Sequence, residues 1–236
     1  MRKYVFTAKI TRPIPSRFFV RKRLFRLLDR CRKYPVIWIN GPAGSGKTTL
    51  VSSYLDVNRL PCLWYQVDEG DSDIATFFSY MGMAAKQASP RRRKPLPLLT
   101  PEYLQGIPTF ALRYFENLFD RLKVPSLLVL DNYHSVPSGS NFHDVICNGL
   151  STIPEGINVI IISRHDLPPN LSRFRANGLI KVVGWDELQL SLEESSGIVR
   201  LREEGKTSKD AVKRLHDATN GWVAGLVLML ESLKRG

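Results

Sequence analysis

The sequence predicts an α/β fold, a three-layer sandwich with a mostly parallel β-sheet, followed by a small all-helical subdomain. Short runs that are apolar on both faces alternate with helical patterns over most of the chain. A glycine-rich loop, GPAGSGKTTL, joins the first of these runs to a helix. After Trp185 the strand signals stop and only helical patterns continue. We therefore expect one domain over residues 1–185 and a helical subdomain over residues 186–236.

The composition is that of a soluble globular protein. The chain has 236 residues, of which 43% are hydrophobic and 24% charged, so it can bury a sizeable core. It has no apolar run of membrane-spanning length, and its start, MRKYVFTAKITRP, lacks the apolar stretch of a signal peptide. Three cysteines without a CxxC pair favour structural thiols in a reducing compartment over a disulfide or metal role. We expect a cytoplasmic protein with no membrane partner.

The net charge of +12 is concentrated near the N-terminus, where residues 1–33 hold 12 Lys and Arg against one acid. Residues 20–33, VRKRLFRLLDRCRK, place apolar residues among the charges, which predicts a basic amphipathic helix packed on a larger body. A solvated helix face explains these charges more simply than phosphate contacts do. A second basic cluster, at residues 91–94, lies in a proline-broken loop. We do not expect this stretch of chain to bind nucleic acid directly.

Five apolar runs are predicted to be the strands of the sheet. They are Val36–Asn40, Pro61–Asp68, Ser126–Asp131, Ile157–Ser163 and, as an edge strand, Gly178–Gly184. Helices are predicted from the glycine-rich loop through Tyr54, over Asp73–Ala88, within residues 100–123 with a break near Gly106–Pro108, and within residues 141–153. Because parallel strands need crossover connections, this alternation favours a parallel sheet covered by helices.

Three helices are predicted after Trp185. Ser191 and Glu194 stand at the spacing of a capping box, which opens a helix that runs to about Glu203. Two more are predicted over Thr207–Thr219 and Gly221–Arg235. About fifty residues of helix would be marginally stable alone, so we expect them to pack on the sheet domain. The chain stops soon after an apolar helix, which suggests part of a longer protein.

The chemistry of the chain starts in GPAGSGKTTL. Gly41, Gly46, Lys47 and Thr48 satisfy the pattern G-x-x-x-x-G-K-[ST] between a predicted strand and a predicted helix. Such a loop turns successive backbone N–H groups toward a phosphate, and the helix N-terminus adds partial positive charge. Lys47 would bridge the β- and γ-phosphates and Thr48 would hold Mg²⁺. The predicted fold is therefore that of a P-loop NTPase that binds ATP or ADP with Mg²⁺. The predicted loop residues are Gly41, Pro42, Ala43, Gly44, Ser45, Gly46, Lys47, Thr48 and Thr49.

Two strand ends are predicted to complete the site. Asp131 would share the metal with Thr48. Asn132 stands where many ATPases of this strand order carry a second acid, and an amide cannot accept the proton of the attacking water, so hydrolysis should be slow unless another base serves. Arg164 would sense the γ-phosphate or stabilise its transition state, unless it is a surface arginine. Any catalysis would therefore rest on Lys47, Asp131 and Arg164.

Three other polar residues near strand ends have open roles. His134 and His165 are predicted to be structural hydrogen-bonding residues more readily than catalysts. Asp68 either touches the metal shell or caps the next turn.

The motifs together resemble a known group of proteins. In order along the chain they are TRP…FVRKRLFRLL, INGPAGSGKTTLVSSYL, LWYQVDEGDSD, LLVLDNYHSV, IISRHDLP and TNGWVAGL. This set is similar to the nucleotide-binding region of the large ATP-dependent LuxR-type transcription regulators, which belong to the STAND class of signal-transduction ATPases. The resemblance covers nearly the whole chain.

The resemblance implies an ATP/ADP switch, in which ADP holds a closed monomer and ATP with an inducer favours an open, self-associating form. It implies that Val20 and Arg21 lie beside the adenine and that the helical subdomain is a lid. It also implies a helical-repeat sensor and a C-terminal DNA-binding helix-turn-helix in missing regions of a longer chain. Two departures put turnover in question: Asp131-Asn132 replaces two acids, and Gly221-Trp222-Val223 replaces the Gly-x-Pro of the lid.

The function predicted is thus a regulatory module that reports its nucleotide through the lid and hydrolyses ATP slowly or not at all. One alternative is a small-molecule phosphotransferase, whose base would have to be His134 or Asp68. Another is an ATPase stimulated by nucleic acid through the basic residues at 21–33 and 91–94.

Overall fold

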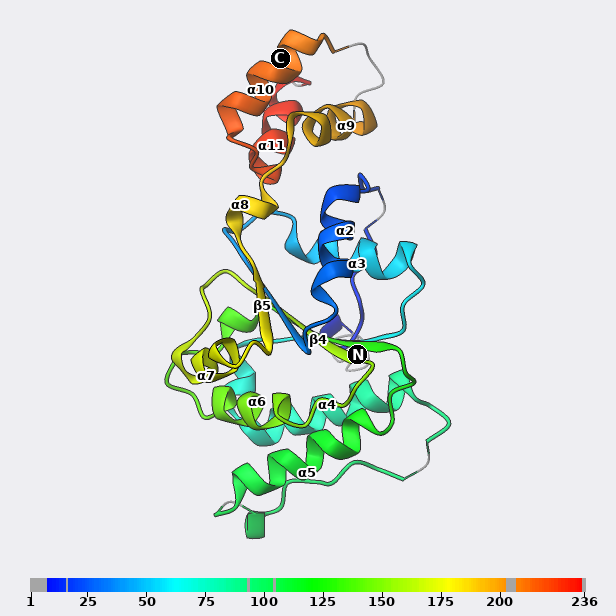
Figure 1. Ribbon diagram of the computed structural model, residues 1–236, viewed down its shortest axis with the longest axis vertical. Helices are drawn as coiled ribbons and strands as arrows, with labels where there is room; N and C mark the ends of the chain where they lie inside the picture. The colour runs from blue at the N-terminus through cyan, green and yellow to red at the C-terminus, as the bar shows by residue number, and fades with distance from the viewer. Residues whose placement is uncertain (1–7, 16, 93, 104, 203–206, 235–236) are drawn as a thin grey trace.

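The computed structural model describes residues 8–15, 17–92, 94–103, 105–202 and 207–234 (Figure 1). At its centre is a parallel five-stranded sheet with the strand order β2-β3-β4-β1-β5. The strands are β1 (Val36–Asn40), β2 (Cys62–Gln66), β3 (Ser126–Asp131), β4 (Ile157–Ser163) and β5 (Ile180–Val183). The predicted parallel sheet, with its last strand at an edge, is confirmed.

The register of the sheet places the polar residues at the ends of neighbouring strands next to one another. Asn40 is paired with Ser163 at the ends of β1 and β4, and Gln66 with Asp131 at the ends of β2 and β3. β3 and β4 are buried along their whole length, which explains why their sequences are continuously apolar up to the last residue. The side chains that follow these strands therefore emerge along one edge of the sheet.

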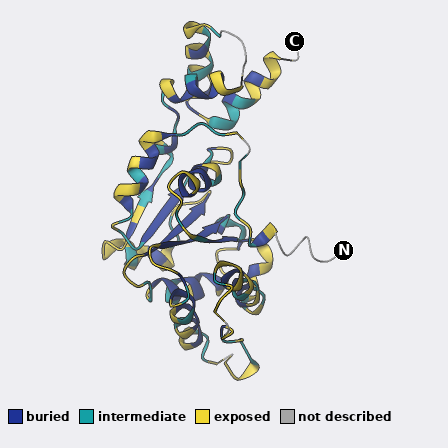
Figure 2. Cartoon of the chain, turned by 90° about the vertical axis from the view of Figure 1, so that its right-hand side faces the viewer, coloured by how far each residue is buried: buried dark blue, intermediate teal, exposed yellow. Residues whose placement is uncertain are grey.

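Helices cover both faces of the sheet (Figure 1). On one face lie α2 (Lys22–Cys31) and α3 (Lys47–Val57), and on the other α4 (Ile74–Ala88), α5 (Ile107–Phe119) and α6 (Phe142–Leu150). The short helices α7 (Ser172–Ala176) and α8 (Trp185–Leu188) flank β5 in the chain. Figure 2 shows the buried strands between helices whose outer faces are exposed. The predicted three-layer sandwich is confirmed.

Several helix boundaries differ from the predictions, among them those of α2 and α5. α2 is shorter than residues 20–33, but its buried face, which includes Leu24, Phe25 and Leu28, is the predicted one. α5 starts after Gly106, as expected from the predicted break, but ends at Phe119 instead of continuing to Lys123. After Phe119 the backbone tightens into i→i+3 hydrogen bonds, such as that from the N–H of Leu122 to the carbonyl of Phe119 (3.0 Å).

Three helices follow α8: α9 (Leu192–Arg202), α10 (Lys209–Thr219) and α11 (Val223–Leu233). We call them the helical bundle. Its own apolar cluster includes Ile198, Val212 and Leu226, and Phe19 of the N-terminal segment packs against it. The bundle lies beyond the start of α2 at one end of the molecule (Figure 1). The predicted end of α9 at Glu203 lies outside the described residues.

The start of α9 has the predicted capping box. The N–H of Glu194 donates to Ser191 Oγ at 3.2 Å, and the N–H of Ser191 donates to Glu194 Oε2 at 3.1 Å. Throughout the described residues, none of the helices combines the length and the apolar character needed to cross a bilayer.

Candidate functional site

The loop between β1 and α3, which we call the phosphate loop after its predicted role, contains two glycines with positive φ. Gly44 and Gly46 have φ values of 71° and 82°, in the left-handed region that glycine adopts without steric cost. Gly46 is also the N-cap of α3. The two glycines therefore let the chain turn directly from the strand into the helix.

The lysine of the loop is held by the loop itself. Lys47 Nζ donates to the carbonyl oxygens of Gly41 (2.7 Å) and Pro42 (2.9 Å) and to Ser45 Oγ (3.0 Å). Burial lowers the pKa of Lys47 to about 8; the charge of Arg164 also lowers it, against the opposing effect of Asp131. At neutral pH the amine still carries its proton, so it can attract a phosphate.

Thr48 and Asp131 are brought together. Thr48 Oγ1 donates to the two carboxylate oxygens of Asp131 at 3.1 and 3.0 Å, and the N–H of Asn132 donates to the same carboxylate at 2.9 Å. Asp131 is only 1% exposed, and this burial raises its pKa, although the hydrogen bonds and the charge of Lys47 oppose the shift. A hydroxyl and a carboxylate at this distance fit the protein's share of a Mg²⁺ shell.

A metal at this position would need further oxygen ligands. Within the described residues there is no group of three or more His, Cys, Asp and Glu side chains that could hold an ion. Mg²⁺ is commonly held by one or two protein oxygens together with water and substrate phosphates. The Thr48 and Asp131 pair therefore suits a metal that arrives with a nucleotide.

His134 and Arg164 are joined at the ends of β3 and β4. The backbone N–H of Arg164 donates to His134 Nδ1 at 3.3 Å, so the proton of the neutral imidazole lies on Nε2. Burial, together with the charges of Arg164, His165 and Lys47, lowers the pKa of His134 to about 4. His134 is thus neutral and has the structural hydrogen bond that the sequence predicts. The charge of Arg164 thus acts on both His134 and Lys47.

Asp68 is a capping residue. Its carboxylate accepts the N–H of Gly70 at 3.0 Å and pairs with Lys9 at 2.6 Å. This capping role accounts for Asp68, so no role in the metal shell is needed to explain it. It also weakens the case for Asp68 as a base in phosphate transfer.

A cavity of about 320 Å³ opens beside the loop. Its walls come from three parts of the chain: the loop and α3, the N-terminal segment before α2, and the helical bundle. Among its lining residues are Gly46, Thr49, Phe18, Phe19, Ile198 and Val223. Mostly apolar walls with a few polar groups are typical of a pocket for a small molecule.

Arg21 and Val20, the two residues expected beside the adenine, line two different hollows. Arg21 lines the cavity, whereas Val20 lines a separate hollow with residues of α9 and α10. Phe18 and Phe19, which the sequence did not single out, supply the apolar wall instead.

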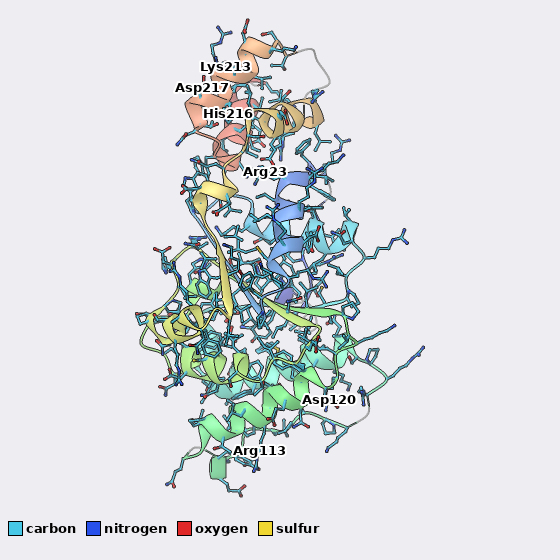
Figure 3. The ribbon with its side chains drawn as sticks, viewed as in Figure 1. Arg23, Arg113, Asp120, Lys213, His216 and Asp217 are labelled. Carbon is cyan, nitrogen blue, oxygen red and sulfur yellow. The ribbon has the colours of Figure 1, made fainter. Side chains whose placement is uncertain are left out.

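Arg21 is also buried against the helical bundle. Its Nη2 donates to Glu194 Oε2 at 2.9 Å and to the carbonyl of Leu188 at 2.8 Å. Arg23 reaches the same carboxylate at 3.2 Å and lies between α2 and the bundle in Figure 3. Burial lowers the pKa of Arg21; burial raises that of Glu194, but the contacts with Arg21 and Arg23 bring it below its ordinary value. The expectation that the basic residues of this helix simply face solvent is therefore wrong for Arg21.

The last helix of the bundle starts on the phosphate loop. Trp222 Nε1 donates to the carbonyl of Ala43 at 2.8 Å, and the N–H of Ala224 donates to the carbonyl of Gly44 at 3.0 Å. Val223, where a proline was expected, is the first residue of α11. This is the helix position that proline favours, so valine preserves the start of the helix.

Comparisons with known proteins agree with this geometry. No protein-family model matches the chain. The chain is 27% identical over 231 residues, 97% of its length, to the HTH-type transcriptional regulator MalT of two Klebsiella pneumoniae strains. It spans 25% of those regulators, about a quarter of their length. The predicted resemblance to the large LuxR-type regulators is confirmed.

Two solved structures share the fold. The Walker-type ATPase PABY2304 of Pyrococcus abyssi matches with a TM-score of 0.59 and 14% identity, over 98% of this chain and 71% of that one. The Orc1 protein of Aeropyrum pernix, solved in complex with DNA, matches with a TM-score of 0.52 and 16% identity, over 95% and 62%. At such low identity these likenesses show the fold alone, and they confirm the predicted P-loop sandwich with its helical extension.

Proposed function

We propose that this chain is the nucleotide-binding module of a signal-transduction ATPase of the LuxR-type regulators. It binds ATP or ADP with Mg²⁺ and reports the bound nucleotide through the helical bundle. The observation that carries the proposal is the cavity beside the phosphate loop, because its walls come from the loop and from the bundle together. The similarity to the MalT regulators over 97% of the chain supports a regulatory role.

Each site residue has a role in this proposal. Lys47 attracts the phosphates, while Thr48 and Asp131 hold Mg²⁺, which neutralises phosphate charge when it is bound. The backbone of residues 41–49 surrounds the phosphates, and Arg164 responds to the γ-phosphate. Arg21 lies at the base end of the nucleotide, with Val20 beside it in the chain.

Hydrolysis is slow in this proposal because the two residues considered after β3, Asn132 and His134, are not proton acceptors of suitable strength. Asn132 is an amide, and the Nε2 of His134 already carries the imidazole proton when Nδ1 accepts from Arg164. The low pKa of His134, about 4, also makes it a weak base. Lys47, Asp131 and Arg164 would then support at most a slow Mg²⁺-dependent turnover.

The two parts of the chain take different roles. Residues 1–185 form the nucleotide-binding domain and residues 186–236 form the lid. ADP favours a closed monomer, whereas ATP and an inducer favour an open form that self-associates. The sensor and DNA-binding regions belong to other parts of a longer chain, which agrees with relatives of which this chain spans about a quarter.

Calorimetric titration with ADP and ATP in the presence of Mg²⁺ tests the proposal. Wild-type protein should bind both, and Lys47→Ala should lose binding, because the buried amine is the main positive charge of the loop. Lys86→Ala is the matched control, since this exposed lysine belongs to α4 on the opposite face of the sheet. Equal affinity of Lys47→Ala and the wild type would refute the assignment.

A further inference from the structure

Four consecutive carbonyl groups of the phosphate loop, those of residues 41–44, accept hydrogen bonds. The first two, of Gly41 and Pro42, accept from Lys47 Nζ. The next two, of Ala43 and Gly44, accept from the helical bundle, through Trp222 Nε1 at 2.8 Å and the N–H of Ala224 at 3.0 Å. The bundle thus binds the two carbonyl groups that Lys47 does not bind.

These contacts determine the direction of two N–H groups. In a trans peptide the carbonyl and the following N–H point to opposite sides, and the one cis bond found in the described residues is Val124-Pro125. When the carbonyls of Ala43 and Gly44 point at the bundle, the N–H groups of Gly44 and Ser45 point away from it, and that of Ser45 donates to the carbonyl of Pro42 at 3.3 Å. Backbone N–H groups at such positions are the ones with which a glycine-rich loop binds phosphate.

We infer that Trp222 is a positioning residue for phosphate binding, which acts by holding the carbonyl of Ala43. The inference rests on the proposed nucleotide binding and adds one residue, far away in the sequence, on which that binding depends. Because coupling between two equilibria is reciprocal, a phosphate on the loop should in turn favour the docked bundle.

The packing around the indole supports this role. A Cβ added to Gly44 would overlap that of Ala224, and one added to Gly225 would lie 2.7 Å from Trp222 Cε3. Glycines on both the loop and the helix therefore leave the space in which the indole reaches Ala43. Trp222 is 37% exposed, so a substitution removes little core packing and acts mainly on the contact with the loop.

Trp222→Phe tests the inference, because it keeps an aromatic ring and removes the N–H donor. The variant should bind ADP about two- to tenfold more weakly, the range expected for one neutral hydrogen bond. Its affinity for adenosine should not change, because adenosine has no phosphate to contact the loop. Met229→Ala, which changes a 38% exposed side chain further along the same helix, should bind both ligands like the wild type.

Hydrogen exchange supplies a second measurement on the same variants. Trp222→Phe should accelerate amide exchange in residues 41–46 and leave the middle of α3 unchanged. Wild-type ADP affinity in Trp222→Phe, or an equal loss for ADP and adenosine, would overturn the inference and leave the proposed function standing. Failure of the wild type to bind ADP at all would overturn both.

Discussion

The ion pair between Arg21 and Glu194 should decide how firmly the helical bundle is docked. The two side chains are 8% and 7% exposed, and they meet at 2.9 Å. Glu194→Ala removes the carboxylate but leaves the guanidinium in place. Arg21 would then be a buried charge with the carbonyl oxygens of Leu188 (2.8 Å) and Gln189 (3.0 Å) as acceptors.

The structure sets the size of the effect. Removal of one partner from a buried ion pair costs about 3–5 kcal/mol, because the other charge is left uncompensated. The lower end applies here, since Arg21 Nη1 and Glu194 Oε1 have no hydrogen-bond partner in the described part of the chain, so the pair itself is incompletely compensated. A loss of about 3 kcal/mol in a chain of this size lowers the melting temperature by about 6–12 °C.

Thermal melting followed by circular dichroism measures this loss, with Asp56→Ala as the matched control. Asp56 pairs with Arg12 at the same distance, 2.9 Å, but is 54% exposed, so its loss should cost at most about 1 kcal/mol. A Glu194→Ala melting temperature no lower than that of Asp56→Ala would refute the reasoning.

The pH dependence of this contribution has a definite sign. The pKa of Glu194 lies below its ordinary value, so the pair stabilises the fold above the pKa of the unfolded chain. The contribution is lost as the pH falls through the folded pKa. The difference in melting temperature between wild type and Glu194→Ala should therefore shrink in strong acid.

Three other changes have expected outcomes. Raising the pH from 7 to 9 should weaken ADP binding, because the pKa of Lys47 is about 8 and the neutral amine does not attract phosphate. Calorimetry at each pH should show a dissociation constant that rises up to about tenfold per pH unit above 8. A dissociation constant that does not change with pH would contradict this. Asn132→Asp should speed ATP hydrolysis by supplying a proton acceptor, whereas a wild type that already releases phosphate at about 1 s⁻¹ or faster would contradict a slow switch. Gly197→Ala should cost about 1–3 kcal/mol in urea unfolding because its methyl would overlap the Phe19 ring, while Gly139→Ala meets nothing within 4 Å; equal stabilities would speak against this packing.

Much of the fold could be predicted because its signals are local. β1, β3 and β4 are buried on both faces, so each is a continuous apolar run whose ends are visible in the sequence. The phosphate loop has a fixed spacing between a strand and a helix. The meeting of Thr48 with Asp131 also follows from the sequence, because parallel strands end at the same edge of a sheet.

The contacts that attach the bundle could not be predicted in the same way. Arg21 and Glu194 are 173 residues apart, and Trp222 and Ala43 are 179 apart. Glu194 fitted a local capping box, and that role concealed its second role as the partner of Arg21. Trp222 lies in the predicted lid motif, where the sequence indicated only that the following proline is replaced by Val223. Neither hydrophobic periodicity nor motif spacing carries information on such distant pairs.

The strand order has a consequence for folding during synthesis on the ribosome. β1 is the first strand to be made, yet both of its neighbours, β4 and β5, lie more than a hundred residues later in the chain. At roughly 5–20 residues per second, about 6–25 s pass between the synthesis of β1 and that of its first partner strand, β4. The bundle emerges later still, so the cavity beside the phosphate loop is completed after the sheet. In the proposed function, nucleotide would then bind this cavity only after the bundle has emerged from the ribosome.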